Sequence, residues 1–346
     1  MDFRLTDEQQ MLAETVQAMF ADSCTGADLR RLLDSGEARD AARWSQIVDM
    51  GLPGVMAPEK AGGAGLGMVE MALIAVAAGH AALPEPLVEH AGVAVPLLAE
   101  AGIDVSPWLS GDTVAVGHPT NPFVADADSA SALLLADGDD VHLVPADVVA
   151  LTRQDSIDGF RRLFRIDWAP SASTRIGDSM LWDAAFDRGA LFAAAQLLGL
   201  AQRAVDLSVA YAADRHQFGK PIGSFQAVKH HLATAQVKIE FARPVLLAAA
   251  GMADGPLRRA RISHAKLAAT AAADAATHAA VQVHGAMGYS WEVDVHFLLK
   301  RALALGQAWG TPGVHRARVA DHIFSSAPGA GHGFDADIEE DRCEAA

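Results

Sequence analysis

Two long stretches of the chain carry small or apolar residues at three- and four-residue steps, one on each side of residues 213–223. On the first stretch these residues are Leu198, Ala201, Val205, Ser208 and Ala212. On the second they are Val228, Leu232, Ala235, Ile239 and Ala242. The spacing predicts two helices that each bury one face. The intervening sequence DRHQFGKPIG contains glycines and a proline that predict a turn, and Ser224 is expected to cap the second helix.

The same patterning divides the chain into four parts. Helical periodicity dominates residues 1–105, where Thr6 and Gln9 are expected to form a capping box. It returns over residues 181–325, which include an Ala-rich helix expected to end at Gly285. We place a helical domain, a β domain, a helical bundle and a flexible acidic tail at residues 1–105, 106–180, 181–325 and 326–346.

Short apolar runs replace the helical pattern between the two helical parts. Four of these runs are expected to form strands, and they begin near Thr113, Ala132, Val141 and Leu163. Asp137-Gly138 lies between the second and third runs and is typical of a β-hairpin turn. The predicted fold is therefore mostly α, with a reduced central β domain.

Composition and charge narrow the classes of function. Of the 346 residues, 51% are apolar but only 6% are aromatic, which favours closely packed helices over a β sandwich. The net charge of -16 argues against a nucleic-acid partner. No run approaches the roughly 20 apolar residues that span a bilayer. The first ten residues also lack the features of a signal peptide. We therefore expect a cytoplasmic protein without a membrane partner.

The residues that could bind metal show no organised pattern. Cys24 and Cys343 lie far apart in the sequence, so neither a disulfide framework nor a cysteine metal site is expected. The fourteen histidines have no HExxH or comparable spacing, and we interpret them as scattered surface and loop residues. No metal ligand is assigned.

The turn between the two long helices carries Arg215 and Phe218. A guanidinium group can form two hydrogen bonds to a phosphate, and a phenyl ring can stack on a planar group. The pair therefore suits a planar anionic ligand such as a nucleotide. Its spacing fits equally well a simple helix–helix loop with a solvated arginine.

The sequence RHQFGKPIGSFQ, at residues 215–226, resembles the R-x-x-F-G-x-x-I-x-x-F-Q signature of the flavin-dependent acyl-CoA dehydrogenase family. QVHGAMGY, at residues 282–289, resembles the Q-x-x-G-G-x-G-Y motif of the same family. The resemblance implies an N-terminal helical domain, a central β domain and a C-terminal four-helix bundle. It also implies FAD as cofactor and an acyl-CoA substrate. The cofactor contacts that it implies are Arg215, Phe218, Gln226, Gln282 and Gly285.

Two parts of the family pattern are missing. Residues 116–123, VGHPTNPF, stand where the family has a T-E-P-x-A-G-S-D-like segment that lines the flavin ring. Acyl-CoA dehydrogenation needs a carboxylate as general base, and the family supplies a glutamate at one of two positions. In this chain those two positions are occupied by Gly189 and Trp309. No catalytic residue is therefore assigned. Trp309 could fill the core or form the wall of a closed pocket, and we expect the wall. The nearby acids are interpreted as solvated: Asp183, Asp187, Glu292 and Asp294.

The resemblance implies that FAD crosses a subunit interface, with the ring in one subunit and the adenine and diphosphate side reached from its neighbour. This chain retains the motifs for the adenine and diphosphate side but not those for the flavin ring. In this respect it resembles the short subunits of heteromeric acyl-CoA dehydrogenases acting on steroid side chains. A second subunit of the same family is then the expected partner in a heterotetramer. Two alternatives stay open. One is a self-sufficient homotetrameric dehydrogenase with a relocated base, and the other is a flavin-binding or scaffold protein without dehydrogenase activity.

Overall fold

The computed structural model describes residues 3–325, and the predicted tail at 326–346 lies outside the described residues. The chain begins with helices α1 (Asp7–Ser23), α2 (Gly26–Ser35), α3 (Ala41–Asp49) and α4 (Met68–His80). The predicted capping box is confirmed. The Gln9 backbone N–H donates to Thr6 Oγ1 at 3.2 Å, and the Thr6 N–H donates to Gln9 Oε1 at 3.1 Å.

After α4 the chain forms one compound helix. It consists of α5 (Leu87–Glu89), a π-helical turn (His90–Ala94) and α6 (Val95–Glu100), followed by the short α7 (Ser106–Leu109). Pro96 does not break this helix, because it lies in the first turn of α6, where the missing N–H costs little.

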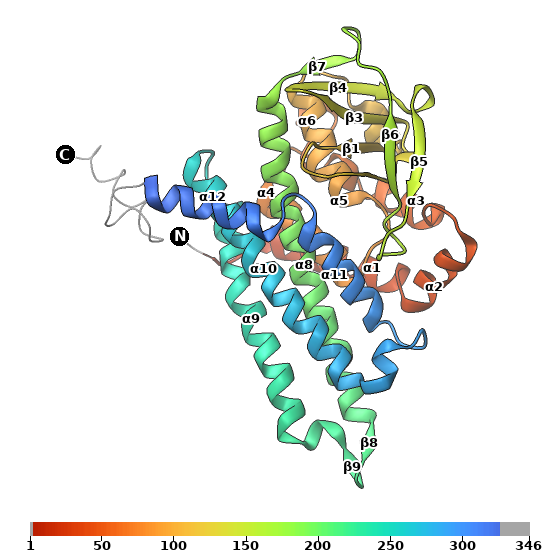
Figure 1. Cartoon of the computed structure of the whole chain (residues 1–346), viewed down its shortest axis with the longest axis vertical. Coiled ribbons are helices and arrows are strands. Elements are labelled where there is room, and N and C mark those ends of the chain that lie inside the picture. Colours follow the sequence, from red (N-terminus) through yellow and green to blue (C-terminus); the bar gives the residue numbers. More distant parts are fainter. Residues whose placement is uncertain (1–2, 326–346) are drawn as a thin grey trace, which may run out of the picture.

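The β domain consists of two small sheets beside the helices (Figure 1). The first sheet has the order β1-β3-β4-β7, with strands Val114–Gly117, Ala132–Asp137, Asp140–Pro145 and Arg175–Gly177. The second has the order β2-β6-β5, with strands Val124–Ala125, Leu163–Asp167 and Ala150–Gln154. The four predicted strands are present. β3 and β4 form the predicted hairpin, in which Asp137 pairs with Asp140 and Gly138 has a φ of 58°.

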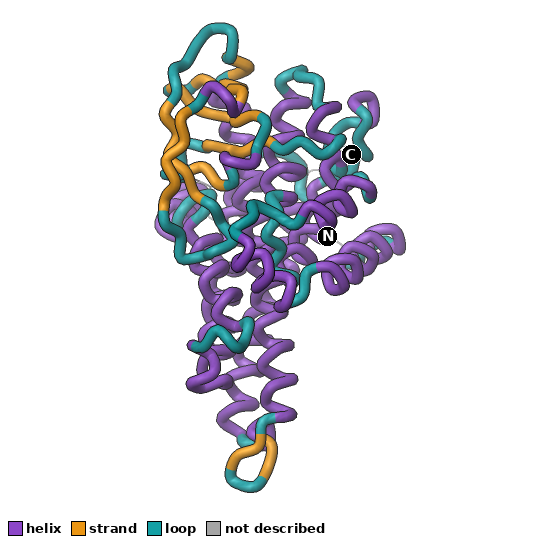
Figure 2. Tube along the Cα trace, turned by 90° about the vertical axis from the view of Figure 1, so that its right-hand side faces the viewer, coloured by secondary structure: helices purple, strands orange, loops and turns teal. Residues whose placement is uncertain are grey.

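The C-terminal helices form an elongated bundle that projects away from the β domain (Figures 1 and 2). They are α8 (Ser179–Asp214), α9 (Gln226–Ala250), α10 (Pro256–His284), α11 (Val295–Gln307) and α12 (Pro312–Ser325). A hairpin of β8 (His216–Gln217) and β9 (Lys220–Pro221) joins α8 to α9 at the far end of the bundle.

Small residues hold the N-terminal helices against the bundle. A Cβ atom on Gly199 of α8 would lie 2.0 Å from the Val76 carbonyl oxygen of α4, and one on Gly79 would lie 2.1 Å from the Gln196 carbonyl oxygen. Backbone therefore meets backbone at this crossing, and no larger side chain fits. This contact explains how an Ala- and Gly-rich sequence with few aromatic residues builds a close-packed core.

The fold corrects two of the sequence predictions. Ser224 does not cap α9: it lies in a 3-10 turn, its hydroxyl donates to the Pro221 carbonyl at 2.8 Å, and the helix begins at Gln226. The histidines are not all at the surface, because six are buried: His90, His118, His142, His284, His296 and His315. Their burial follows from contacts with carbonyl groups and rings of distant segments, which sequence spacing does not reveal.

Within residues 3–325, no helix is both long and apolar enough to cross a bilayer. The same residues hold no group of three or more histidine, cysteine, aspartate or glutamate side chains arranged to bind a metal ion.

Candidate functional site

Arg215 lies at the end of α8, where the chain leaves the helix for the hairpin. Its backbone N–H donates to the Tyr211 carbonyl at 2.8 Å, and its own carbonyl accepts from Ile222 N–H at 2.8 Å, so the backbone on both sides is fixed. The side chain is exposed and forms no ion pair with the described residues. A fixed backbone with a free guanidinium group is suited to binding an anion.

Phe218 occupies the tip of the hairpin with 90% of its side chain exposed. Its φ of 56°, followed by 80° at Gly219, gives the left-handed pair of a two-residue hairpin turn. A bulky residue is disfavoured in this conformation, and such strain is concentrated at functional positions. The ring meets Phe225 edge to face at 6.1 Å and leaves its outer surface to a ligand or a partner chain.

The other three predicted cofactor contacts lie on the helices of the bundle and are exposed. Gln226 is the first residue of α9, Gln282 is in the last turn of α10, and Gly285 directly follows that helix. Gly285 has a φ of 60°, and a Cβ atom there would meet nothing within 4 Å. The position therefore needs glycine for its backbone and leaves free space above it for a ligand.

A ring stack connects the two predicted motifs. The side chains of Tyr211 and His284 lie face to face at 4.2 Å and 23°. Tyr211 is one turn before Arg215, and His284 directly precedes Gly285. A small core of Ala212, Leu232 and Val283 lies at the same end of the bundle. Sequence reasoning missed this stack, because only the tertiary contact brings the two rings together.

A groove between α9 and α10 also adjoins this end of the bundle. Gln282 and Tyr289 line it together with three imidazole side chains, His230, His231 and His278. The sequence signal was available: His230 lies one helical turn after Gln226, and His278 one turn before Gln282. These histidines were not predicted as site residues, because their spacing matches no metal-ligand motif.

The two positions that lack the family's glutamate lie against each other. A Cβ atom on Gly189 would be 2.1 Å from Cδ2 of Trp309, so the indole ring occupies the space that a side chain at position 189 would need. Trp309 has only 1% of its surface exposed. The prediction of a pocket wall is therefore wrong, and Trp309 is a core residue.

Three hydrogen bonds from other segments, and one between the two residues themselves, hold Trp309 and His315 in place. The indole Nε1 donates to Glu89 Oε1 at 3.1 Å, and the Trp309 backbone N–H donates to Asn121 Oδ1 at 3.0 Å. His315 donates from Nε2 to the Trp309 carbonyl at 2.9 Å and accepts the Ser263 hydroxyl at Nδ1, 3.1 Å away. These bonds hold Trp309 in the left-handed conformation, with a φ of 57°.

A buried aromatic cluster surrounds Trp309. His118, from the segment that departs from the family's flavin-ring motif, packs on Trp182, Phe186 and Trp309 with ring centroids 5.1, 5.7 and 5.3 Å apart. Phe186 also faces His315 at 5.7 Å. Burial lowers the pKa of both histidines to about 4, so they are neutral at pH 7 and behave as core residues. We call His118, Trp182, Phe186, Trp309 and His315 the aromatic plug.

Asp183 and Asp187 are the candidates for a relocated base, and both lie beside arginine side chains. Asp187 is buried, and its carboxylate contacts Arg318 at 2.8 Å and Arg259 at 3.4 Å. Asp183 is exposed and lies 3.6 Å from Arg259. The prediction of a solvated acid holds for Asp183 but is wrong for Asp187, which is buried and ion-paired with two partly exposed arginines.

The structure is therefore a mostly helical protein with an exposed arginine and phenylalanine at the far end of its bundle and a buried aromatic cluster around Trp309. Comparison with known proteins identifies the class. Residues 6–104 match the model of the acyl-CoA dehydrogenase N-terminal domain, and residues 181–324 match the model of the acyl-CoA dehydrogenase C-terminal domain.

Individual proteins agree with this class. The chain is 31% identical to acyl-CoA dehydrogenase IpdE2 of Mycolicibacterium smegmatis, and the match covers 92% of this chain and 100% of the relative. In fold it is similar to a chain of the ChsE4-ChsE5 complex from Mycobacterium tuberculosis, with a TM-score of 0.82, 24% identity and coverage of 94% and 100%. It is also similar to a chain of the Tcur3481-Tcur3483 steroid ACAD, with a TM-score of 0.80, 24% identity and coverage of 92% and 98%.

The chain therefore belongs to the acyl-CoA dehydrogenase family. The predicted fold class is confirmed. The five predicted cofactor contacts stay predictions, with Arg215 and Phe218 on the hairpin, Gln226 at the start of α9, and Gln282 and Gly285 at the end of α10.

Proposed function

We propose that this chain is the non-catalytic subunit of a heteromeric FAD-dependent acyl-CoA dehydrogenase. It binds the adenine and diphosphate side of a flavin whose ring lies in a partner subunit. The observation that carries the proposal is the contact between Gly189 and Trp309. Both positions that could hold the family's base are used to close the interior, whereas the nucleotide-binding end stays exposed.

The residues present fit one half of FAD and not the other. Arg215 offers free donors to a diphosphate, Phe218 offers an exposed ring to an adenosine, and Gly285 leaves room beside the backbone. At the opposite end, the aromatic plug fills the region between the β domain and α8. When bound, FAD supplies hydride acceptance. This chain's own residues supply binding and orientation of the nucleotide end.

The partner must then supply the general base. Proton abstraction requires a carboxylate within about 3 Å of the proton, or one water away. Asp187 is committed to two arginines, and Asp183 is exposed beside Arg259. The relatives' names favour a heteromer and a bulky substrate, because one similar structure is a two-component complex and another is called a steroid ACAD. We therefore propose a steroid side-chain acyl-CoA as the substrate of the assembled enzyme.

Isolation of the chain with and without its partner tests the proposal. We expect the chain alone to be colourless and inactive, and a complex with an acyl-CoA dehydrogenase subunit that carries the glutamate to be yellow and active. In that complex, Glu→Gln in the partner should lower turnover by roughly 10²–10⁴, whereas Asp183→Asn in this chain should leave turnover unchanged. A chain that alone binds FAD and oxidises an acyl-CoA contradicts the proposal and supports a homomeric enzyme.

A further inference from the structure

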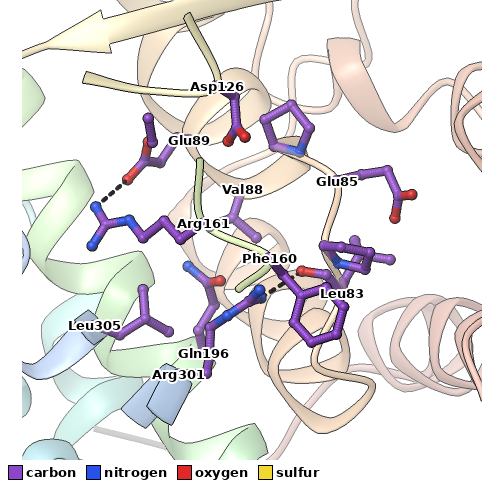
Figure 3. Close-up of a pocket in the computed structure, with 13 residues that line it drawn as sticks. Leu83, Glu85, Val88, Glu89, Asp126, Phe160, Arg161, Gln196, Arg301 and Leu305 are labelled. Carbon is purple, nitrogen blue, oxygen red and sulfur yellow. Dashed lines mark hydrogen bonds and ion pairs between the residues drawn. The ribbon is translucent and has the colours of Figure 1, made fainter. Parts of the chain in front are cut away.

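A small pocket with an accessible volume of about 50 Å³ lies where the compound helix, the β domain and the bundle meet (Figure 3). Its apolar wall includes Leu83, Val88, Phe160 and Leu305. Its polar residues include Glu89 at the end of α5, Asp126 after β2, Arg161 before β6, and Gln196 and Arg301 from α8 and α11. None of these residues belongs to the proposed nucleotide-binding end.

Most charges around the pocket already have an opposite charge beside them. The pairs are Arg43 with Glu85 at 2.7 Å, Arg161 with Glu89 at 3.7 Å, and Arg301 with Asp158. Asp126 is different: its carboxylate forms no hydrogen bond or ion pair within the described part of the chain. Figure 3 shows this carboxylate pointing into the pocket. Asp126 is half-buried, so a ligand that supplies N–H donors would stabilise a carboxylate that has no donor from the described residues.

Two further acceptors face the same space. Gln196 has no hydrogen-bond partner for its side-chain amide among residues 3–325, and Figure 3 shows that amide directed into the pocket from the opposite wall. Glu89 uses Oε1 to accept from Trp309 Nε1 at 3.1 Å, which leaves Oε2 available. The pocket thus offers three oxygen acceptors around a small volume: Asp126, Glu89 and the carbonyl of Gln196.

We propose that this pocket binds the ammonium group of a small primary alkylamine. A primary ammonium has three N–H donors, which match the three acceptors, and its charge balances the one unpaired carboxylate. A short alkyl chain is accommodated by Leu83, Val88 and Leu305. An inorganic anion would instead meet two carboxylates, and Arg161 and Arg301 are already paired with Glu89 and Asp158.

Binding of the ammonium is linked to a proton. Burial, and then the neighbouring Glu89, raise the pKa of Asp126 to about 7, so this carboxyl is often protonated at neutral pH. The charged groups that act on it are Glu89, Arg161, Arg301 and Asp128. The ammonium binds the ionised carboxylate and releases the proton. Its affinity therefore falls as pH decreases below about 7 and is constant above it, as long as the amine itself remains protonated.

Calorimetric titration of the full chain with ethylammonium chloride tests the proposal. We expect saturable binding at pH 8, binding roughly tenfold weaker at pH 6, and proton release that increases as pH falls. Tetramethylammonium has the same charge but no N–H donor, and it should not bind. Equal binding of the two cations, or no saturable ethylammonium binding at pH 8, overturns the proposal.

Matched variants locate the binding site. Asp126→Asn should abolish ethylammonium binding and its pH dependence, and Gln196→Met should weaken binding at least several-fold. Asp139→Asn removes an equal charge from an exposed turn and should change nothing. Far-UV circular dichroism establishes that each variant is folded. If Asp126→Asn does not fold, Gln196→Met alone decides, and unchanged affinity in that variant contradicts the proposed site.

Discussion

Arg215 is the residue to which we assign the main contact with the FAD diphosphate. The loop backbone on both sides of it is hydrogen-bonded, while its guanidinium group has no ion pair within the described residues. A charge-assisted hydrogen bond contributes about 1.5–3 kcal/mol. Arg215→Ala should therefore weaken FAD retention in the assembled complex by roughly tenfold or more. Flavin absorbance after dialysis measures this effect.

The control is Arg243, an exposed arginine further along α9, and the variant Arg243→Ala should retain the flavin. Equal retention in both variants would refute the assignment of Arg215.

Gly189 and Trp309 form a pair whose members should depend on each other. A methyl group on Gly189 would overlap the indole ring, so Gly189→Ala should destabilise the full chain by about 1–3 kcal/mol. Replacement of Trp309 by leucine removes the atoms that the methyl group would meet. In a Trp309→Leu background, Gly189→Ala should therefore cost less, with a coupling energy of at least about 1 kcal/mol. Urea unfolding of the four proteins measures it, and strictly additive costs would show that the two residues do not share one space.

At the scale of elements, the end of α10 combines a structural and a functional requirement. Gly285 and Gly138 both have a positive φ, 60° and 58°, and neither has an atom within 4 Å of a Cβ position. Alanine at either site should cost about 1 kcal/mol of stability, because the left-handed region disfavours a side chain. Only Gly285→Ala should also lower FAD retention, because only there would the methyl group enter the proposed ligand space. Loss of flavin from both variants would contradict the role of Gly285.

Most helices and the longer strands were predictable because their signals are local. The capping box at Thr6, the long stripes of α8 and α9, and the end of α10 at Gly285 all appear in the sequence as spacing or turn chemistry. The strands β2, β5 and β7 were missed, because two are very short and the third has a largely polar and exposed pattern.

The candidate sites were predictable only in part. The motif around Arg215 could be read directly, whereas the aromatic plug joins residues as distant as His118 and Trp309. The same holds for Asp187, whose arginine partners are on α10 and α12. Contacts of this kind depend on tertiary packing, which a single sequence without homologues does not specify.

For the whole molecule, buried histidines set the response to acid. Burial lowers the pKa of His90, His118 and His315 to about 4, from an unfolded value near 6.5. Between these values the unfolded chain binds more protons than the folded chain, so stability falls as pH decreases from about 6.5 to 4. The pKa of Asp126 is raised to about 7, so over this range the folded chain binds about one proton more at Asp126 than the unfolded chain does. This offsets about one of the three extra protons that the unfolded chain binds at the histidines.

The net effect should be a loss of about 2–3 kcal/mol per pH unit near pH 5. Urea unfolding at pH 7, 6 and 5 measures this slope, and His118→Gln should make it shallower. A stability that is flat over this range would mean that the histidines are accessible to protons in the folded state.

The subunit roles are tested most directly by the flavin content of the assembled enzyme. The proposed function has the aromatic plug close this chain's own interior, so that each flavin would need one copy of this chain and one copy of the partner. Native mass spectrometry of the co-purified complex should therefore find about one FAD for every two polypeptides, and none on this chain alone. One FAD for every polypeptide, or a flavin-loaded complex of this chain only, would contradict the account.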